Sequence, residues 1–316
     1  MTRYVARRLL FAVVLVFAVS SASLILARLA EGDYVTSSLG IEARRETRDA
    51  LRAHYGLDKS IGAQYRDWLL RAIRLDFGNS LLYDRPVRDL VPERAANTAI
   101  LAVSGLLLAT LVGLPLGIVA GSRRSGLLPA AIRSASVVFL SLPPLLTSLL
   151  LVFVAARTGW LPIGGIRSAG VPPGGDTLDL LRHLIVPACA LALPMAAAFE
   201  RLQAQALGET IGAPFVLAAL SRGIPRERIV WRDGLKASLR PVAAWYGLAI
   251  GALLSGSFAV EVTTSWPGLG NLMLAALRAR DVYLVAGCAG AGAMFLAFGT
   301  LVSDVALALV DPRARE

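Results

Sequence analysis

Cysteine and histidine are both scarce in this chain, which has two of each. Cys189 and Cys288 lie in apolar runs, and no cysteine spacing typical of a disulfide framework or a zinc site occurs. The sequence has no Gly-Lys pair, so the phosphate-binding loop G-x-x-x-x-G-K-[ST] is absent, as are H-E-x-x-H and G-x-S-x-G. The sequence therefore predicts no catalytic centre, no bound cofactor and no metal site.

Charge is also scarce, because charged residues make up 17% of the chain and hydrophobic residues 56%. In soluble domains the charged share is about a quarter. This composition indicates a membrane protein. The net charge of +10 does not point to nucleic acid, because no soluble region of the size of a domain concentrates the basic residues. Basic cytoplasmic loops explain that charge, and we expect membrane lipid, not nucleic acid, as a partner.

Six apolar segments are long enough to cross the hydrocarbon core, which takes about 20 residues of helix. An Arg or Asp at the centre of a membrane helix costs about 2.5–3.5 kcal/mol, so the charges at each end set the expected boundaries. The predicted spans are 9–28, 97–120, 134–156, 183–200, 241–260 and 282–309. The first span follows basic residues, as a signal peptide does, but its apolar run is too long and predicts a retained anchor.

Basic residues gather in the N-terminal tail and in two loops, 121–133 and 201–240, where they outnumber acidic residues. The loops 157–182 and 264–281 are more balanced. By the positive-inside rule, the tail and the two basic loops lie in the cytoplasm. The predicted fold is an all-α integral membrane protein with six transmembrane helices and both termini inside (N-in/C-in).

The segment 29–96 lies on the outer side in this topology and is too regularly patterned for a simple loop. One set of its residues recurs at the spacing of an amphipathic helix that could lie at the membrane surface: Tyr65, Trp68, Leu69, Ala72 and Ile73. We therefore predict a helical cap at 29–96, between a tail with the first span at 1–28 and a core domain with five spans at 97–316.

Short motifs follow one another along nearly the whole chain. They are Tyr55-Gly-Leu-Asp58, Gln64-Tyr65, Trp68-Leu69, Asp76-Phe-Gly-Asn-Ser80, Pro86-Val87, His183-Leu with Pro187, Leu191-Ala-Leu-Pro194, Pro267-Gly-Leu-Gly270, Arg280-Asp281 and Asp311-Pro312-Arg313. In this order and spacing the chain resembles the first of the two permease subunits of bacterial dipeptide and oligopeptide ATP-binding-cassette (ABC) importers.

The resemblance implies a multi-pass permease of the bacterial cytoplasmic (inner) membrane that translocates peptides by alternating access. Its partners would be a second homologous permease, two ABC ATPase subunits and an extracytoplasmic substrate-binding protein. ATP would be used by the partner subunits, and this chain would bind no cofactor and would not be an enzyme. Several prolines would act as hinges or cavity features, or as fixed bends for packing: Pro115, Pro143, Pro144, Pro187 and Pro194. Ser141, just before Leu-Pro-Pro, fits a helix kink.

Part of the 201–240 loop is similar to the coupling loop of such importers, whose E-A-A-x-x-x-G pattern forms a short helix that docks on the ATPase. Small alanines allow close docking, and Gly223 supplies the left-handed turn that ends a helix. Leu217 stands where the pattern has Glu, and relatives tend to have basic residues at Leu217 and Leu220, so this helix is more apolar than expected. The predicted coupling residues are Leu217, Ala218, Ala219, Leu220, Ser221, Arg222, Gly223, Ile224 and Pro225.

Two further features follow the predicted coupling residues along the chain. Basic residues at four-residue steps, Arg228, Arg232, Lys236 and Arg240, predict one charged face on a helix that returns to the membrane at Pro241. On the opposite side, Pro267, Gly268 and Gly270 predict a tight external turn close to the docking surface of the binding protein.

Other functions stay open. The chain could be an ABC permease for nickel chelates or another small solute, a self-contained secondary transporter, or a structural membrane scaffold. A secondary transporter should show internal repeats and charges within its spans, whereas only Asp304 falls inside a predicted span and not at its end. A scaffold would not need a coupling-type loop.

Overall fold

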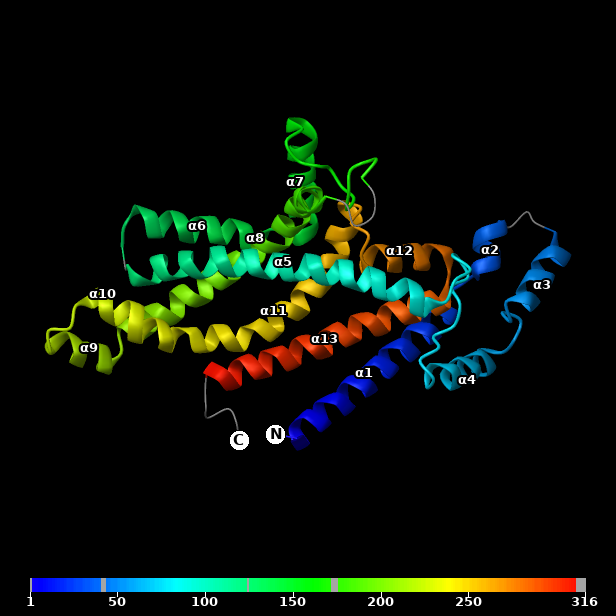
Figure 1. Cartoon of the computed structure of the whole chain (residues 1–316), viewed down its shortest axis with the longest axis horizontal. Helices are drawn as coiled ribbons and strands as arrows, with labels where there is room; N and C mark the ends of the chain where they lie inside the picture. Colours follow the sequence, from blue (N-terminus) through cyan, green and yellow to red (C-terminus); the bar gives the residue numbers. More distant parts are fainter. Residues whose placement is uncertain (1, 41–43, 124, 172–175, 311–316) are drawn as a thin grey trace. The chain divides into compact units, whose positions relative to one another are not determined.

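A computed structural model describes residues 2–40, 44–123, 125–171 and 176–310. Those residues are mainly helical and carry a single isolated β-bridge, between Asn79 and Pro86. The elements, shown in Figure 1, are α1 (Thr2–Leu29), α2 (Tyr34–Leu39), α3 (Arg45–His54), α4 (Ile61–Ala72), α5 (Val87–Ser122), α6 (Leu127–Ser141), α7 (Pro144–Thr158), α8 (Thr177–Ile211), α9 (Pro214–Ser221), α10 (Arg226–Arg228), the π-helix η1 (Ile229–Gly234), α11 (Leu235–Thr263), α12 (Leu269–Ala279) and α13 (Val282–Val310).

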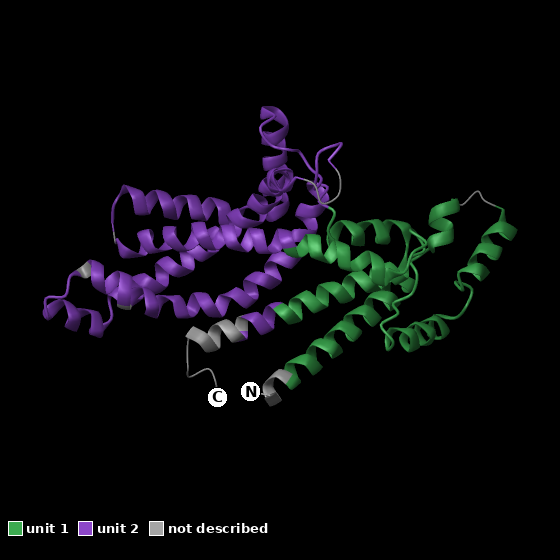
Figure 2. Cartoon of the chain, in the orientation of Figure 1, with its two compact units in different colours: residues 1–99, 267–298 green, residues 100–266, 299–316 purple. Residues whose placement is uncertain are grey.

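The chain divides into two compact units, which Figure 2 shows in different colours. Unit 1 comprises Met1–Ala99 and Pro267–Phe298, and unit 2 comprises Ile100–Trp266 and Gly299–Glu316. Unit 1 therefore contains the segment predicted as a cap together with residues 267–298. Unit 2 contains the predicted coupling loop.

Five of the described helices are long and apolar enough to cross a membrane, and a bent helix pair makes a sixth if it is counted as one span. The five are Ala6–Leu29, Val87–Ser122, Thr177–Ile211, Ile229–Thr263 and Val282–Val302, and the bent pair is α6 with α7. The all-helical membrane fold is thus confirmed, and the helices cover the predicted spans, although the span predicted at 134–156 is divided between α6 and α7.

The break in that span has a local cause. The axes of α6 and α7 differ by 103°. Pro143 has no N–H and disfavours the helical conformation in the residue before it. Leu142 accordingly ends α6 in the β region, at φ −93° and ψ 114°, and Pro144 starts α7 at a position that suits proline. The kink predicted at Ser141 is therefore a sharp bend that separates two helices.

The helices also extend beyond the predicted span limits. α5 begins at Val87, ten residues before the predicted start, and α8 runs from Thr177 to Ile211 instead of 183–200. Charged residues limit the part of a helix that lies in hydrocarbon, but they do not end the helix itself, because its backbone bonds remain satisfied outside the membrane. As a result, α8 includes Glu200 and Arg201.

Helix α8 forms the centre of unit 2, where α6, α7 and α11 all pack against it. Phe199 of α8 is fully buried, and its ring lies 5.4 Å from that of Trp245 and 4.9 Å from that of Tyr246, both on α11. The Tyr246 hydroxyl is 2.8 Å from Oγ1 of Thr110 on α5. Aromatic contacts and a hydrogen bond therefore hold α5, α8 and α11 in one core.

A row of small residues lets α5 approach α8 closely. The row repeats at every fourth position and consists of Gly105, Ala109, Gly113, Gly117 and Gly121. A Cβ atom added at Gly113 would lie 2.5 Å from the carbonyl oxygen of Ala196, and one at Gly121 would lie 2.6 Å from that of Ala204. Backbone meets backbone along this row, as in the small-residue contacts of membrane helices.

Unit 1 contains the predicted cap, which consists of α2, α3 and α4. The stripe predicted on α4 points mainly into the protein: Trp68 and Ala72 are fully buried and pack with Leu24 of α1 and Ala286 of α13. Ile73 is exposed. The buried part of the amphipathic stripe of α4 therefore packs within unit 1.

An ion pair joins α2 to α3 in the cap. Asp33 caps α2 by accepting a hydrogen bond from the Thr36 backbone N–H, and Nε of Arg52 lies 2.6 Å from Asp33 Oδ2. Burial raises the pKa of Asp33, but the hydrogen bonds from Arg52 and Thr36 outweigh it and hold the pKa at about 2. The folded pKa is depressed, so this contact contributes stability at neutral pH and is lost as the pH falls from 3.8 to about 2.

Asp281 ties the segment before α5 to the start of α13. Its side chain is fully buried, and Oδ2 accepts hydrogen bonds from the Ser80 hydroxyl (2.6 Å) and the Leu82 N–H (3.1 Å). Oδ1 accepts from the Leu284 N–H (3.0 Å) in the first turn of α13. A carboxylate near a helix N-terminus also interacts favourably with the helix dipole.

We expect Asp281→Asn to destabilise unit 1, because the amide would point its NH₂ group at backbone N–H donors. A lost hydrogen bond to a charged group costs about 1.5–3 kcal/mol. Amide hydrogen exchange of residues 79–86 should accelerate in this variant. The matched control is Asp84→Asn, an exposed residue of the same segment, which should leave exchange unchanged. Equal exchange in the two variants would contradict the role of the Asp281 carboxylate.

Candidate functional site

The predicted coupling residues fall on α9 and on the turn that follows it. Leu217, Ala218, Ala219, Leu220 and Ser221 belong to α9, and Arg222 is its C-cap. Pro214 occupies the first helical turn, where its missing N–H has no intrahelical partner to lose. In Figure 1, α9 and α10 lie at the same end of unit 2 as the connection between α5 and α6.

Gly223 ends α9 in a Schellman motif. Its φ is 80°, in the left-handed region. The Ile224 N–H donates to the Ala219 carbonyl (3.2 Å) and the Gly223 N–H to the Leu220 carbonyl (2.9 Å). Ile224 packs back onto Ala219, which supplies the apolar contact typical of this motif. Pro225 then leads into α10, so the Gly-Ile-Pro sequence fixes the turn between two helices.

A small apolar core holds the segment together. Val216, Ala219 and Ile229 are buried in one cluster, with Ile224 packed against it. Ala219 therefore points inward, toward the following helix. It does not belong to the outer surface, although the sequence interpretation placed it among the docking residues.

The rest of the α9 surface is largely apolar and exposed, and it runs around the helix from Leu220 through Leu217 and Ala218 to Phe215. Phe215 is 49% exposed, Leu217 59% and Leu220 39%. Ala218 is exposed as well. Placing such side chains in water is unfavourable by about 25 cal/mol per Å² of apolar surface, and contiguous exposed apolar surface in a soluble loop is typical of a binding site. The two leucines that depart from the family pattern thus lie on this surface, which we call the α9 face (Phe215, Leu217, Ala218 and Leu220).

A second cluster connects this segment to the membrane helices. Val230 of η1 packs with Ile118 of α5 and Leu207 of α8, and Ile211 and Leu235 pack around them. The segment is therefore attached to three long helices of unit 2 through buried side chains.

The basic stripe does not form the regular helical face that its spacing predicts. Arg228, Arg232, Lys236 and Arg240 are all exposed, but the π-helix Ile229–Gly234 interrupts the α-helical register between them. A π-helix inserts extra residues into a turn, so a four-residue step no longer returns to the same face. The helix also continues through Pro241, which lies inside α11.

The turn predicted on the outer side of the membrane is a connection into α12 whose glycines are buried within the protein. The Pro267 carbonyl accepts a hydrogen bond from the Asn97 amide (2.8 Å), and the Leu269 N–H donates to the Thr98 hydroxyl (2.8 Å). Gly268 and Gly270 are buried, and Gly268 has φ −100° and ψ −171°, an extended conformation open to any residue. The positive φ of this region is at Ser265.

Sequence reasoning missed several residues of interest. Phe215 belongs to the α9 face, and Trp231 of η1 is 61% exposed nearby in the sequence; large apolar residues in a basic loop were the available signal. Glu200 of α8 and Glu261 of α11 are buried carboxylates that lie at or just beyond the predicted span ends. The prediction named Asp304 as the one charge within a span and therefore left out these two carboxylates. The motif Asp311-Pro312-Arg313 lies outside the described residues.

No set of three or more His, Cys, Asp or Glu side chains in the described part of the chain is placed to hold a metal ion. The polar groups at the α9 face are backbone and hydroxyl groups already bonded within the segment, such as the Ser221 hydroxyl on the Ala218 carbonyl (3.1 Å). The arrangement therefore suits protein contact.

Comparison with known proteins identifies the family of the chain. Residues 113–316 match the sequence model described as "Binding-protein-dependent transport system inner membrane component", and residues 1–99 match that of its N-terminal region. The chain is 28% identical over 315 residues to the oligopeptide transport system permease protein AppB of Bacillus subtilis (strain 168), with 99% of each chain covered. It is 33% identical over 330 residues to the oligopeptide transport system permease protein OppB of Mycobacterium tuberculosis, with 100% of this chain and 99% of the relative covered.

A solved structure shares the fold. A chain of the MetNI methionine ABC transporter in an inward facing conformation matches with a TM-score of 0.52 and 17% identity, covering 71% of this chain and 95% of that one. At this identity the likeness concerns the fold alone. The two family matches together with the full-length relatives show that the chain belongs to the family of binding-protein-dependent transport system inner membrane components, the multi-pass permease subunits of ABC importers of the inner membrane.

Proposed function

We propose that this permease translocates peptides and that the α9 face docks on an ABC ATPase subunit, whose ATP hydrolysis drives transport. The α9 face is the observation that carries the proposal, because it places Phe215, Leu217 and Leu220 in an exposed position on a short helix with its own buried core. Peptide cargo is supported by the names of the two relatives, both oligopeptide transport system permeases.

The proposed assembly contains a second homologous permease, two ATPase subunits and an extracytoplasmic substrate-binding protein. ATP binds to the ATPase subunits, and this chain contributes the path and the coupling segment. In the proposed topology both termini and the coupling segment are cytoplasmic. The cap (residues 29–96) is external and close to the binding protein. The turn at Pro267, Gly268 and Gly270 lies on the same external side. The arrangement of unit 2 supports this topology, because the two basic loops lie at one end of that unit (Figure 1).

Reconstitution tests the proposal. The purified chain in liposomes should not transport peptide by itself. With the second permease, the ATPases and the binding protein, it should take up a labelled tripeptide when ATP is supplied. Unlabelled di-, tri- and pentapeptides should compete, and a nickel chelate should not. Uptake by the chain alone under an ion gradient would identify a secondary transporter, and ATP-driven uptake of the nickel chelate alone would overturn the peptide assignment.

A further inference from the structure

The carboxylate of Glu200 is buried within a membrane-spanning helix and is incompletely satisfied. Glu200 is 2% exposed, and its Oε1 atom is buried without a hydrogen-bond partner. Ionisable residues within membrane spans are costly and generally mark a functional path or binding site. A buried acceptor without a donor from its own chain therefore indicates a donor that arrives from outside the chain.

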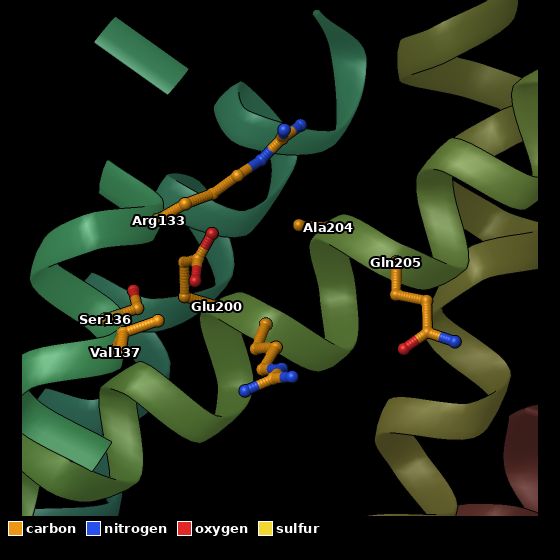
Figure 3. A pocket seen from close by; sticks show the side chains of 7 residues that line it. Arg133, Ser136, Val137, Glu200, Ala204 and Gln205 are labelled. Atoms are coloured by element: carbon orange, nitrogen blue, oxygen red, sulfur yellow. The ribbon is translucent and has the colours of Figure 1, made fainter. Parts of the chain in front are cut away.

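Glu200 lines a cavity of about 360 Å³ between α6 and α8. In Figure 3 its carboxylate points into the space between Arg133 and Ala204. The remaining lining residues are Ser136, Val137, Arg201 and Gln205. The Ser136 side chain is buried, so two polar groups, one carboxylate and one hydroxyl, lie at the inner part of the cavity.

The positive charges of the cavity are placed differently from its negative charge. Arg133 is held by the end of α5, because its Nη2 atom donates to the Ala120 carbonyl (2.9 Å). Arg201 and Gln205 are exposed, whereas Glu200 is buried. The cavity is therefore lined by one buried anionic group and two exposed cationic groups, Arg133 and Arg201, which together complement a ligand that carries both charges.

We propose that this cavity binds a ligand with a primary ammonium group beside an anionic group. The ammonium donates to the Glu200 carboxylate, and the anion faces Arg201. A primary ammonium has three donors, so it can also bond the Ser136 hydroxyl. Two molecules supply this chemistry: a short peptide with free termini and the phosphoethanolamine head group of a membrane lipid. The peptide source rests on the proposed function, whereas the ammonium site itself does not.

Calorimetric titration of the purified chain, in nanodiscs made without phosphatidylethanolamine, tests the site. The probes are dialanine, N-acetyl-dialanine, dihexanoyl-phosphatidylethanolamine and the corresponding phosphatidylcholine. We expect dialanine or the ethanolamine lipid to bind, and its N-acetylated or N-methylated counterpart to bind at least about tenfold more weakly, because the charge-assisted hydrogen bond is lost. Glu200→Gln should weaken binding by a similar factor. Glu209→Gln, an exposed carboxylate of the same helix, should not.

Binding of dialanine alone would assign the site to cargo, and binding of the ethanolamine lipid alone would assign it to lipid. Each result supports the ammonium site. Binding by neither probe, or binding that is insensitive both to blocking the amine and to Glu200→Gln, overturns it. The comparison of blocked and free amines uses the unmodified chain and so does not depend on the folding of a variant. Since no ATPase or ATP is present, this result is independent of the reconstitution test of transport.

Discussion

Gly113→Leu is expected to prevent the correct folding of unit 2. A Cβ atom at this position would lie 2.5 Å from the Ala196 carbonyl oxygen and 2.9 Å from Cβ of Phe199, and leucine adds three further carbon atoms. Neither contact can be relieved by a flexible side-chain end, so α5 must separate from α8. Overpacking in a tight interior costs about 1–3 kcal/mol and sometimes more, which exceeds the gain of about 1 kcal/mol in helix propensity.

The matched control is Gly208→Leu, the same substitution on α8. Gly208 is exposed, and a Cβ atom there would have no neighbour within 4 Å. This variant should fold as well as the parent chain or slightly better. Size-exclusion chromatography and thermal unfolding in detergent measure both variants. An unchanged unfolding temperature for Gly113→Leu would mean that α5 and α8 do not approach each other as described.

Leu217→Glu is expected to abolish ATP-driven transport while the permease itself remains folded. Leu217 is on the exposed α9 face, so the change leaves the interior of unit 2 unaltered. Burying a leucine contributes about 1.5–3 kcal/mol to docking, and an unpaired carboxylate in the interface costs several kcal/mol more. Co-purification of the ATPases and substrate-stimulated ATP hydrolysis should both be lost. Leu217→Met, which keeps volume and polarity, should retain both.

Three further variants separate docking from folding of the segment. Ala219→Glu and Gly223→Val should also uncouple transport, but because they disrupt the inner cluster and the left-handed turn. Both should increase proteolysis of residues 213–230 in the permease without ATPases, whereas Leu217→Glu should not. Arg232→Ala should have little effect, since a single exposed charge contributes about 0–1 kcal/mol. Full coupling in Leu217→Glu would contradict docking through the α9 face.

The sequence predicted the helices best where one physical rule decides the outcome. Uncharged runs located the membrane spans because the bilayer excludes charge, and Gly-Ile-Pro located the end of α9 because few residues adopt that turn. The rules failed where tertiary packing decides. The stripe on α4 has the pattern of a membrane-surface helix, yet Trp68 packs inside unit 1. The inward position of Ala219 depends on Ile229, a residue of another helix that a local pattern does not include.

Other features had a signal in the sequence that was not used. The repeat of small residues on α5 is visible at four-residue spacing and indicates a helix contact, although not which helix it meets. Leu-Pro-Pro was used to predict a kink, but the size of the bend follows from Pro143 and from the packing of α6 and α7 on α8, which the sequence does not show. Glu200 was treated as a boundary, because a rule that uses charge to end a span cannot also recognise a charge kept within one.

The helical stretch from η1 into α11 connects the proposed coupling segment to the opposite end of unit 2. Ile229–Thr263 is a single helical stretch of 35 residues, about 50 Å at 1.5 Å per residue. A hydrogen-bonded helix resists compression, so we expect a displacement at Ile229 to act on Thr263, although the π-helix and Pro241 let the stretch bend between them. There the Thr263 hydroxyl donates to Ser148 of α7 (2.7 Å). The displacement would therefore reach α7, the helix that follows the 103° bend at Pro143.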